Sequence, residues 1–152
     1  MSLLVRIRAA LRASLFGWIA GLAASSPFQI VEAVRNAGAG TRLLAYELAV
    51  VLGLWTVLTF AMALYWCGFF LLPVVWLSSA GWVARRRWSC IVASTIFGLV
   101  LMALRLHVWT ALDHDGIGLF NFYMWCVFAG TFFATAAAWF AKFQRAAPET
   151  PA

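Results

Sequence analysis

The residues best suited to chemistry lie close together, at and after the end of the third apolar run of the chain. The group comprises one arginine, two histidines and two aspartates: Arg105, His107, Asp113, His114 and Asp115. Imidazoles and carboxylates are common ligands of transition metals, so this group could form a metal site. The alternative is an interfacial cap, in which the aspartates form a turn and Arg105 reaches the lipid headgroups or an acid. The sequence favours the cap, because both histidines belong to one end of one helix, whereas haem ligands usually come from facing helices.

Other catalytic patterns are absent from the sequence. There is no GxSxG, HExxH, P-loop or other glycine-rich phosphate loop. The three cysteines, Cys67, Cys90 and Cys126, form no CxxC pair and lie inside apolar runs, as expected of small buried side chains. We therefore expect no catalytic residue, no bound metal and no cofactor.

The composition excludes an ordinary water-soluble domain. Hydrophobic residues make up 65% of the chain and charged residues 11%, whereas soluble domains have roughly 45–50% and about 25%. So few charges could not cover a small soluble fold, and lipid must be the solvent. The net charge of +6 is concentrated in short clusters between apolar runs, so nucleic acid is not an expected partner.

Four apolar runs predict an all-α integral membrane protein with about four transmembrane helices. We expect the crossings at about 13–34, 43–69, 88–112 and 116–141, within a transmembrane domain spanning 13–145. Residues 1–12 read as a basic lead-in and residues 146–152 as a disordered tail. The N-terminal end also fits a secretion signal, with a basic start, an apolar stretch and small residues at Ala23-Ala24-Ser25. The apolar run continues through Phe28 and Ile30, which favours a retained helix.

One uncharged stretch is too long for a single crossing. Residues 48–84 contain no charge, and as one straight helix they would measure about 55 Å, against a hydrocarbon core of about 30 Å. We expect a break near Cys67-Gly68 or Pro73. The segment near 70–84 then either lies at the interface or forms a re-entrant loop, and both alternatives stay open.

The distribution of basic residues predicts the orientation. Four crossings place eight basic residues on one side, and three on the other. The eight are Arg6, Arg8, Arg12, Arg85, Arg86, Arg87, Lys142 and Arg145. The positive-inside rule then places both termini in the cytoplasm, with the protein in the inner (plasma) membrane. Arg85, Arg86 and Arg87 are expected to anchor this topology and to meet lipid headgroups.

Small residues at a spacing of four predict where the helices pack. Helices in lipid associate through close contact at such residues. One ladder comprises Ala13, Gly17, Gly21 and Ser25, and another comprises Gly130, Ala134 and Ala138. These ladders could form internal seams or an oligomer face, and the small size of the chain favours internal seams.

By elimination, the sequence favours a non-catalytic protein that binds or stabilises another membrane component. No apolar run carries an ionisable residue near its centre, as a pump or ion carrier would. The expected role is a subunit of a membrane complex or an immunity-type protein, with the bilayer and either another membrane protein or a second copy as partners. The alternatives are a small oligomeric channel or transporter, and a metal-binding or redox protein that uses His107 and His114.

Overall fold

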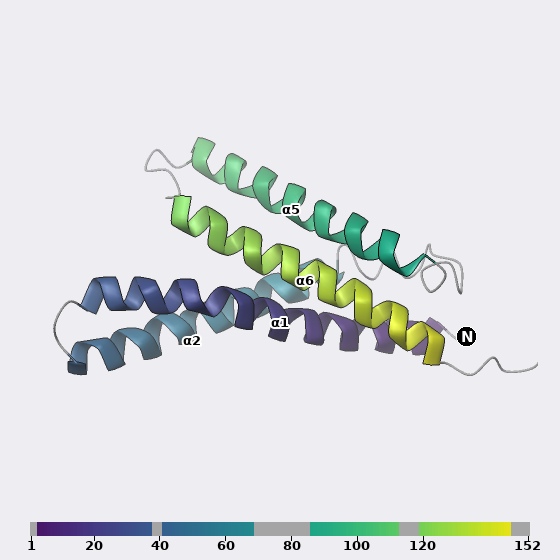
Figure 1. Cartoon of the computed structure of the whole chain (residues 1–152), viewed down its shortest axis with the longest axis horizontal. Coiled ribbons are helices and arrows are strands. Elements are labelled where there is room, and N and C mark those ends of the chain that lie inside the picture. The colour runs from purple at the N-terminus through teal and green to yellow at the C-terminus, as the bar shows by residue number, and fades with distance from the viewer. Residues whose placement is uncertain (1–2, 38–40, 69–85, 113–118, 147–152) are drawn as a thin grey trace, which may run out of the picture.

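The computed structural model of the chain describes residues 3–37, 41–68, 86–112 and 119–146. These residues form four helices (Figure 1): α1 (Leu3–Ala37), α2 (Thr41–Trp66), α5 (Arg87–Leu112) and α6 (Leu119–Ala146). Each helix is long and apolar enough to cross a membrane. The prediction of an all-helical chain with four helices of membrane length is confirmed, and the four helices indicate a multi-pass membrane protein.

The helices begin and end close to the expected bounds, with one clear difference. α1 begins at Leu3, so the basic lead-in with Arg6, Arg8 and Arg12 is part of the helix. α2 ends at Trp66 and is followed by a π-helical turn at Cys67 and Gly68. The expected interfacial or re-entrant segment near 70–84, and the tail from residue 147, lie outside the described residues.

α1 continues through Pro27 without an interruption. Proline has no backbone N–H, so the carbonyl of Ala23, four residues earlier, loses its usual donor. The hydroxyl of Ser26 donates to this carbonyl at 3.0 Å instead. A neighbouring side chain thus satisfies the freed backbone group, as membrane helices require.

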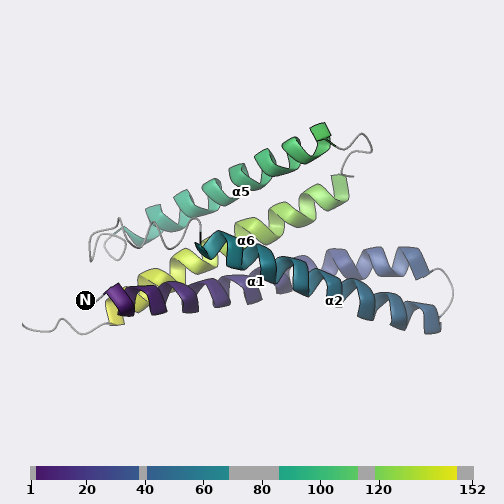
Figure 2. The same ribbon diagram turned by 180° about the vertical axis from the view of Figure 1, so that it is seen from behind.

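The helices are arranged in the order α2, α1, α6, α5, with α6 and α1 in the middle (Figures 1 and 2). Neighbours in this order run antiparallel, so the start of α1 and the end of α6 lie at the same end of the molecule. The buried share of the spanning segment is 56% for α6 but 17% for α2 and for α5. The two outer helices are therefore covered on one side only.

The contact between α1 and α6 pairs small residues with aromatic rings. Gly17 lies against Phe132 and Ala136, and Gly21 lies against Phe128. Nearer the start of α1, Ala10 and Ala13 pack around Phe140. Residues spaced four apart along α1 thus contact residues spaced four apart along α6 in the opposite direction. Such close packing stabilises helices in lipid.

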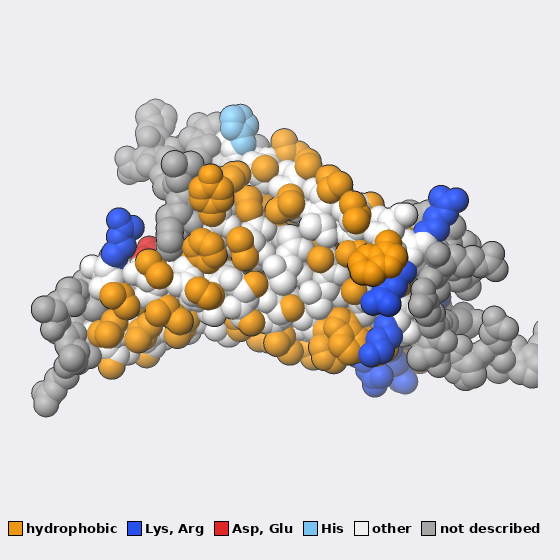
Figure 3. All heavy atoms as spheres, viewed as in Figure 1, with side chains coloured by type: hydrophobic (Ala, Val, Ile, Leu, Met, Phe, Trp, Pro, Cys, Tyr) orange, Lys and Arg blue, Asp and Glu red, His pale blue; other side chains and the backbone are white. Residues whose placement is uncertain are grey.

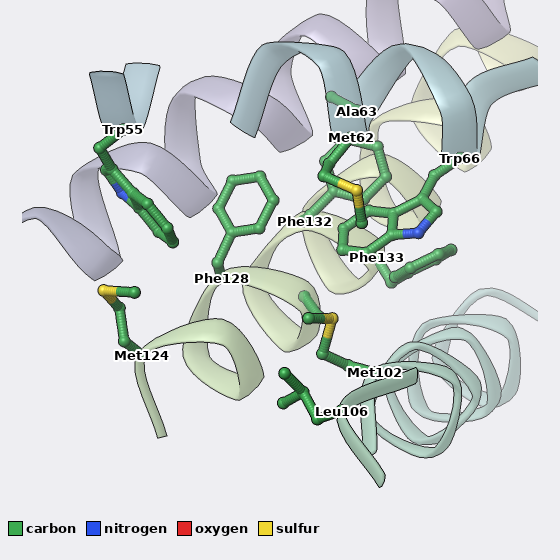
Figure 4. Packing of buried hydrophobic residues seen from close by; sticks show 11 residues of the cluster. Trp55, Met62, Ala63, Trp66, Met102, Leu106, Met124, Phe128, Phe132 and Phe133 are labelled. Carbon is green, nitrogen blue, oxygen red and sulfur yellow. The ribbon is translucent and has the colours of Figure 1, made fainter. Parts of the chain in front are cut away.

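An aromatic and methionine core fills the space between α6 and the two outer helices (Figure 4). α6 contributes Met124, Phe128, Ala129, Phe132 and Phe133; α2 contributes Trp55, Met62, Ala63 and Trp66; α5 contributes Met102 and Leu106. Trp66 lies 5.1–5.7 Å, centroid to centroid, from three phenylalanine rings of α6. Side chains, rather than backbone contact, therefore connect α2 to α5.

The surface matches a molecule surrounded by lipid. Hydrophobic side chains cover the middle of the face shown in Figure 3, while Lys and Arg gather at the end where α1 begins and α6 ends. Large apolar side chains such as Val57 and Leu104 are well exposed. The Lys and Arg at this end thus flank an apolar band, as expected of a membrane protein.

Candidate functional site

α1 and α2 are joined by two reciprocal hydrogen bonds between indoles and hydroxyls. The Nε1 of Trp55 on α2 donates to the hydroxyl of Ser25 on α1 at 3.0 Å. In the opposite direction, the Nε1 of Trp18 on α1 donates to the hydroxyl of Thr59 on α2 at 3.2 Å. Both hydroxyls are completely buried. An indole N–H inside a membrane needs an acceptor, and each helix supplies one to the other.

Each of these hydroxyls also uses its own proton. Ser25 donates to the carbonyl of Gly21 at 2.8 Å, and Thr59 donates to that of Trp55 at 2.8 Å. One turn beyond Ser25, the buried amide of Gln29 donates to the thioether of Met124 on α6. These polar groups therefore form hydrogen bonds that hold helices together. None of these bonds activates one of the hydroxyls as a nucleophile.

The predicted polar group is only partly described. Arg105 and His107 lie on α5, and both side chains are exposed. Asp113, His114 and Asp115 lie outside the described residues. Within the described helices, no group of three or more His, Cys, Asp or Glu side chains could hold a metal ion. A metal site at His107 and His114 stays a prediction.

The contact made by Arg105 differs from the expected one. Its Nη1 lies 2.7 Å from the sulfur of Met62 on α2, rather than on an acid of the described residues. Arg105 is seven residues, about two helical turns, beyond Gly98, so both lie on the same face of α5. Gly98 packs against the ring of Phe133 on α6. The face that carries Arg105 is therefore the face turned toward the other helices.

The predicted packing residues occupy two different contacts. Gly17 and Gly21 lie against α6, inside the molecule. Gly130 instead faces α5, where the side chain of Leu99 is its nearest neighbour. Ala134, one turn further along α6, is half-buried. The phenylalanines that contact the glycines of α1 were not among the predicted packing residues.

The basic residues expected at the inner face lie at one end of the molecule. Arg86 and Arg87 stand at the start of α5, and Arg85 lies outside the described residues. The guanidinium of Arg87 lies 5.9 Å from the centre of the Trp88 ring, and Lys142 lies 4.4 Å from that of Trp139. Phe16 stacks on Trp139 at 4.3 Å. Aromatic rings beside cations are typical of a membrane interface.

Comparisons of the chain with protein-family models, with curated proteins and with solved structures find no match.

Proposed function

We propose that this chain is a non-catalytic membrane protein that binds another membrane protein along the partly covered side of α2 and α5. The observation that carries the proposal is the uneven covering of the four helices. α6 is mostly buried, whereas α2 and α5 bury 17% of their spanning segments. Side chains of both outer helices join the core on α6. Helices with this much uncovered length can accept a further helix without rearrangement of the core.

The interior supports a binding role over a catalytic one. Its largest fully buried side chains are Trp66, Phe128, Phe132, Thr59 and Ser25. The two hydroxyls of this group already bond to tryptophans and to backbone carbonyls. Aromatic packing and satisfied hydrogen bonds make a rigid support, which is what a partner surface needs.

The orientation belongs to the same proposal. Both termini are placed in the cytoplasm and the protein in the inner (plasma) membrane, on the strength of the positive-inside rule. The described residues contribute six basic side chains to the end where α1 begins: Arg6, Arg8, Arg12, Arg86, Arg87 and Lys142. Arg35 is at the opposite end.

The alternative of an oligomeric channel has one fewer interface available. The ladder with Gly17 and Gly21 was considered as an oligomer face as well as an internal seam. Both glycines are in contact with phenylalanines of α6 in the same chain, and a second copy cannot use that face unless α6 moves away.

Photo-crosslinking in living cells tests the proposed function. A photoreactive amino acid replaces Leu58 or Leu101, which lie one turn before Met62 and Arg105 on the sides where α2 and α5 approach each other. Val57 and Val100, the neighbouring residues turned away, are the matched controls. We expect Leu58 and Leu101 to yield an adduct with the same protein, and the controls to yield none. Lipid adducts alone at all four positions would refute the proposed function.

A further inference from the structure

Arg105 lies much deeper in the membrane than its place in the sequence indicates. On α1, Arg12 and Glu32 are twenty residues apart, and the run between them carries no charge. Twenty residues of helix measure about 30 Å, which is the thickness of the hydrocarbon core. This run provides a scale of depth for the whole molecule, because α1 contacts both α2 and α6.

A first series of contacts fixes the depth of the guanidinium. Arg105 bonds to Met62, which is one turn from Thr59 on α2, and Thr59 accepts a hydrogen bond from Trp18 on α1. Trp18 is six residues from Arg12 and fourteen from Glu32, about 9 Å and about 21 Å along the helix. α2 runs antiparallel to α1, so Met62 is three residues closer than Thr59 to the end that carries Arg12. The guanidinium therefore lies inside the uncharged run, about 5 Å from the level of Arg12.

A second series of contacts, through α6, shows that the backbone of Arg105 also lies inside the run and closer to its middle. Gly98 on α5 packs against Phe133, and the adjacent Phe132 packs against Gly17 on α1. Arg105 is seven residues further toward the outer end than Gly98, so its backbone is about 10 Å beyond the level of Gly17. That level is still about 12 Å short of Glu32. The sequence placed Arg105 at the outer end of the third crossing because it follows the uncharged run from Trp88 to Leu104.

The partner of this cation among the described residues is too weak to stabilise it. A guanidinium carries five N–H donors and is always charged, whereas a thioether is a weak acceptor. Cations inside a membrane pair with an anion or line a polar pathway, because isolation in hydrocarbon is costly. The side chain of Arg105 is nevertheless exposed, on the face of α5 turned toward α2.

Neither of the carboxylates that the structure describes, those of Glu32 and Glu47, is at the right depth. The five acidic residues of the chain are Glu32, Glu47, Asp113, Asp115 and Glu149, and all lie at or beyond the ends of the apolar runs. The segment that links α2 to α5, residues 69–85, contains no acid. A second copy of the chain, inserted with the same topology, would bring Glu32 and Glu47 to the same outer levels, where they could not neutralise Arg105.

We propose that Arg105 pairs with a carboxylate, an Asp or Glu within the membrane-spanning part of a helix of another protein, which docks between α2 and α5. The inference rests on the proposed function and specifies the chemistry of its partner. Charge complementarity selects the occupant, because a lipid tail would leave the cation unpaired and a helix with one intramembrane acid would neutralise it. The guanidinium provides the parallel donors that bind a carboxylate in a bidentate manner.

A designed peptide provides the direct test. The probe is a polyleucine transmembrane helix with one central Asp, and the matched controls carry Asn or Leu at the same position. Association with the full-length protein is measured by fluorescence transfer in phosphatidylcholine vesicles. We expect the Asp peptide to bind at least tenfold more tightly than either control, Arg105→Gln to abolish the difference, and Arg105→Lys to retain most of it. Arg35→Gln, which alters an exposed arginine outside the apolar run, should change nothing.

Three results would overturn the inference. The first is equal binding of the Asp and Leu peptides, and the second is undiminished binding of the Asp peptide after Arg105→Gln. The third is anion flux through protein-containing vesicles that disappears with Arg105→Gln, because such flux would make Arg105 part of an ion pathway. Tryptophan fluorescence establishes that each variant is folded, and Arg105→Met serves as a second neutral variant that suits a lipid surrounding. A partner adduct at Leu58 that survives Arg105→Gln would leave the proposed function intact and contradict the inference alone.

Discussion

The indole of Trp55 donates a hydrogen bond to the hydroxyl of Ser25 over 3.0 Å and thereby joins α2 to α1. Ser25 is also one member of the small-residue ladder of α1, four residues beyond Gly21. The same stripe of α1 therefore packs on α6 through its glycines and bonds to α2 through its serine. α1 holds the two halves of the molecule together by both means.

The first prediction concerns this hydrogen bond. Ser25→Ala removes the acceptor and should destabilise the protein by about 0.5–1.5 kcal/mol, the usual range for hydrogen bonds between membrane helices. Trp55→Phe removes the donor, and a double-mutant cycle measured by unfolding in mixed micelles should give a favourable coupling between the two residues. Thr56→Ala is the control, because the Thr56 hydroxyl bonds to a carbonyl of its own helix. Additive effects of Ser25→Ala and Trp55→Phe would show that the bond contributes nothing.

The second prediction compares two glycines. A Cβ at Gly17 would lie 2.7 Å from the backbone oxygen of Phe132, whereas a Cβ at Gly53 would meet nothing within 4 Å. Gly17→Ala should therefore destabilise by about 1–3 kcal/mol through overpacking. Gly53→Ala should be neutral or stabilise by up to about 1 kcal/mol, because alanine favours the helix. The reverse order in a micelle unfolding experiment would mean that α1 and α6 do not pack as described.

The third prediction is a rescue. The neighbours of a Cβ at Gly98 are side-chain atoms of Phe133, so Gly98→Ala should destabilise the protein and Phe133→Leu should relieve much of the loss by making room. A coupling of about 1 kcal/mol or more is expected. At Gly17 the nearest atom belongs to the backbone, so Phe132→Leu should rescue Gly17→Ala poorly. Equal rescue at both sites would argue against this distinction between side-chain and backbone contact.

The fourth prediction concerns Pro27. Ser26→Ala leaves the carbonyl of Ala23 without a donor and should cost about 1 kcal/mol in the membrane. In a Pro27→Ala background, the restored N–H of residue 27 can serve that carbonyl, and Ser26→Ala should then have little effect. The comparison requires unfolding free energies of four proteins, and an equal loss in both backgrounds would disprove the compensating role of Ser26.

The number and kind of the helices follow from the sequence for a physical reason. Hydrocarbon thickness sets the length of a crossing, and charges mark its ends, so runs such as 116–141 can be located without a structure. The beginning of α1 was harder to predict, because Arg6, Arg8 and Arg12 suggested a surface segment. A helix can continue through such residues into the headgroup region, since water and phosphate are available to the charged side chains.

The packing partners could not be predicted from the small-residue ladders. A ladder such as Gly17 and Gly21 shows where a helix accepts close approach, but it does not identify the side chains that enter. These are Phe128 and Phe132, whereas the sequence indicated Gly130 and Ala134 as packing residues of the fourth crossing and assigned them no partner helix. Gly130 is used against α5 instead. Which helices are neighbours depends on the whole assembly, and the spacing within one helix carries no information about it.

The depth of Arg105 was missed for a related reason. In the sequence, Arg105 follows an apolar run that begins at Trp88, and it therefore marks the end of that run. The structure shows that Gly98 is level with Gly17, through Phe133 and Phe132, which sets the start of α5 beyond Arg12 at the basic end. The relative shift of two helices is a tertiary property, and the sequence of one helix does not reveal it.

The central claim is that the chain crosses the membrane four times with both termini in the cytoplasm, and site-directed labelling tests it most directly. In a variant with Cys67, Cys90 and Cys126 replaced by alanine, single cysteines are introduced at Arg8, Arg35 or Lys142, which all have exposed side chains. An impermeant maleimide added to intact cells should label Arg35→Cys, and it should label Arg8→Cys and Lys142→Cys only after the membrane is opened. Labelling of Arg8→Cys or Lys142→Cys in intact cells would contradict the account.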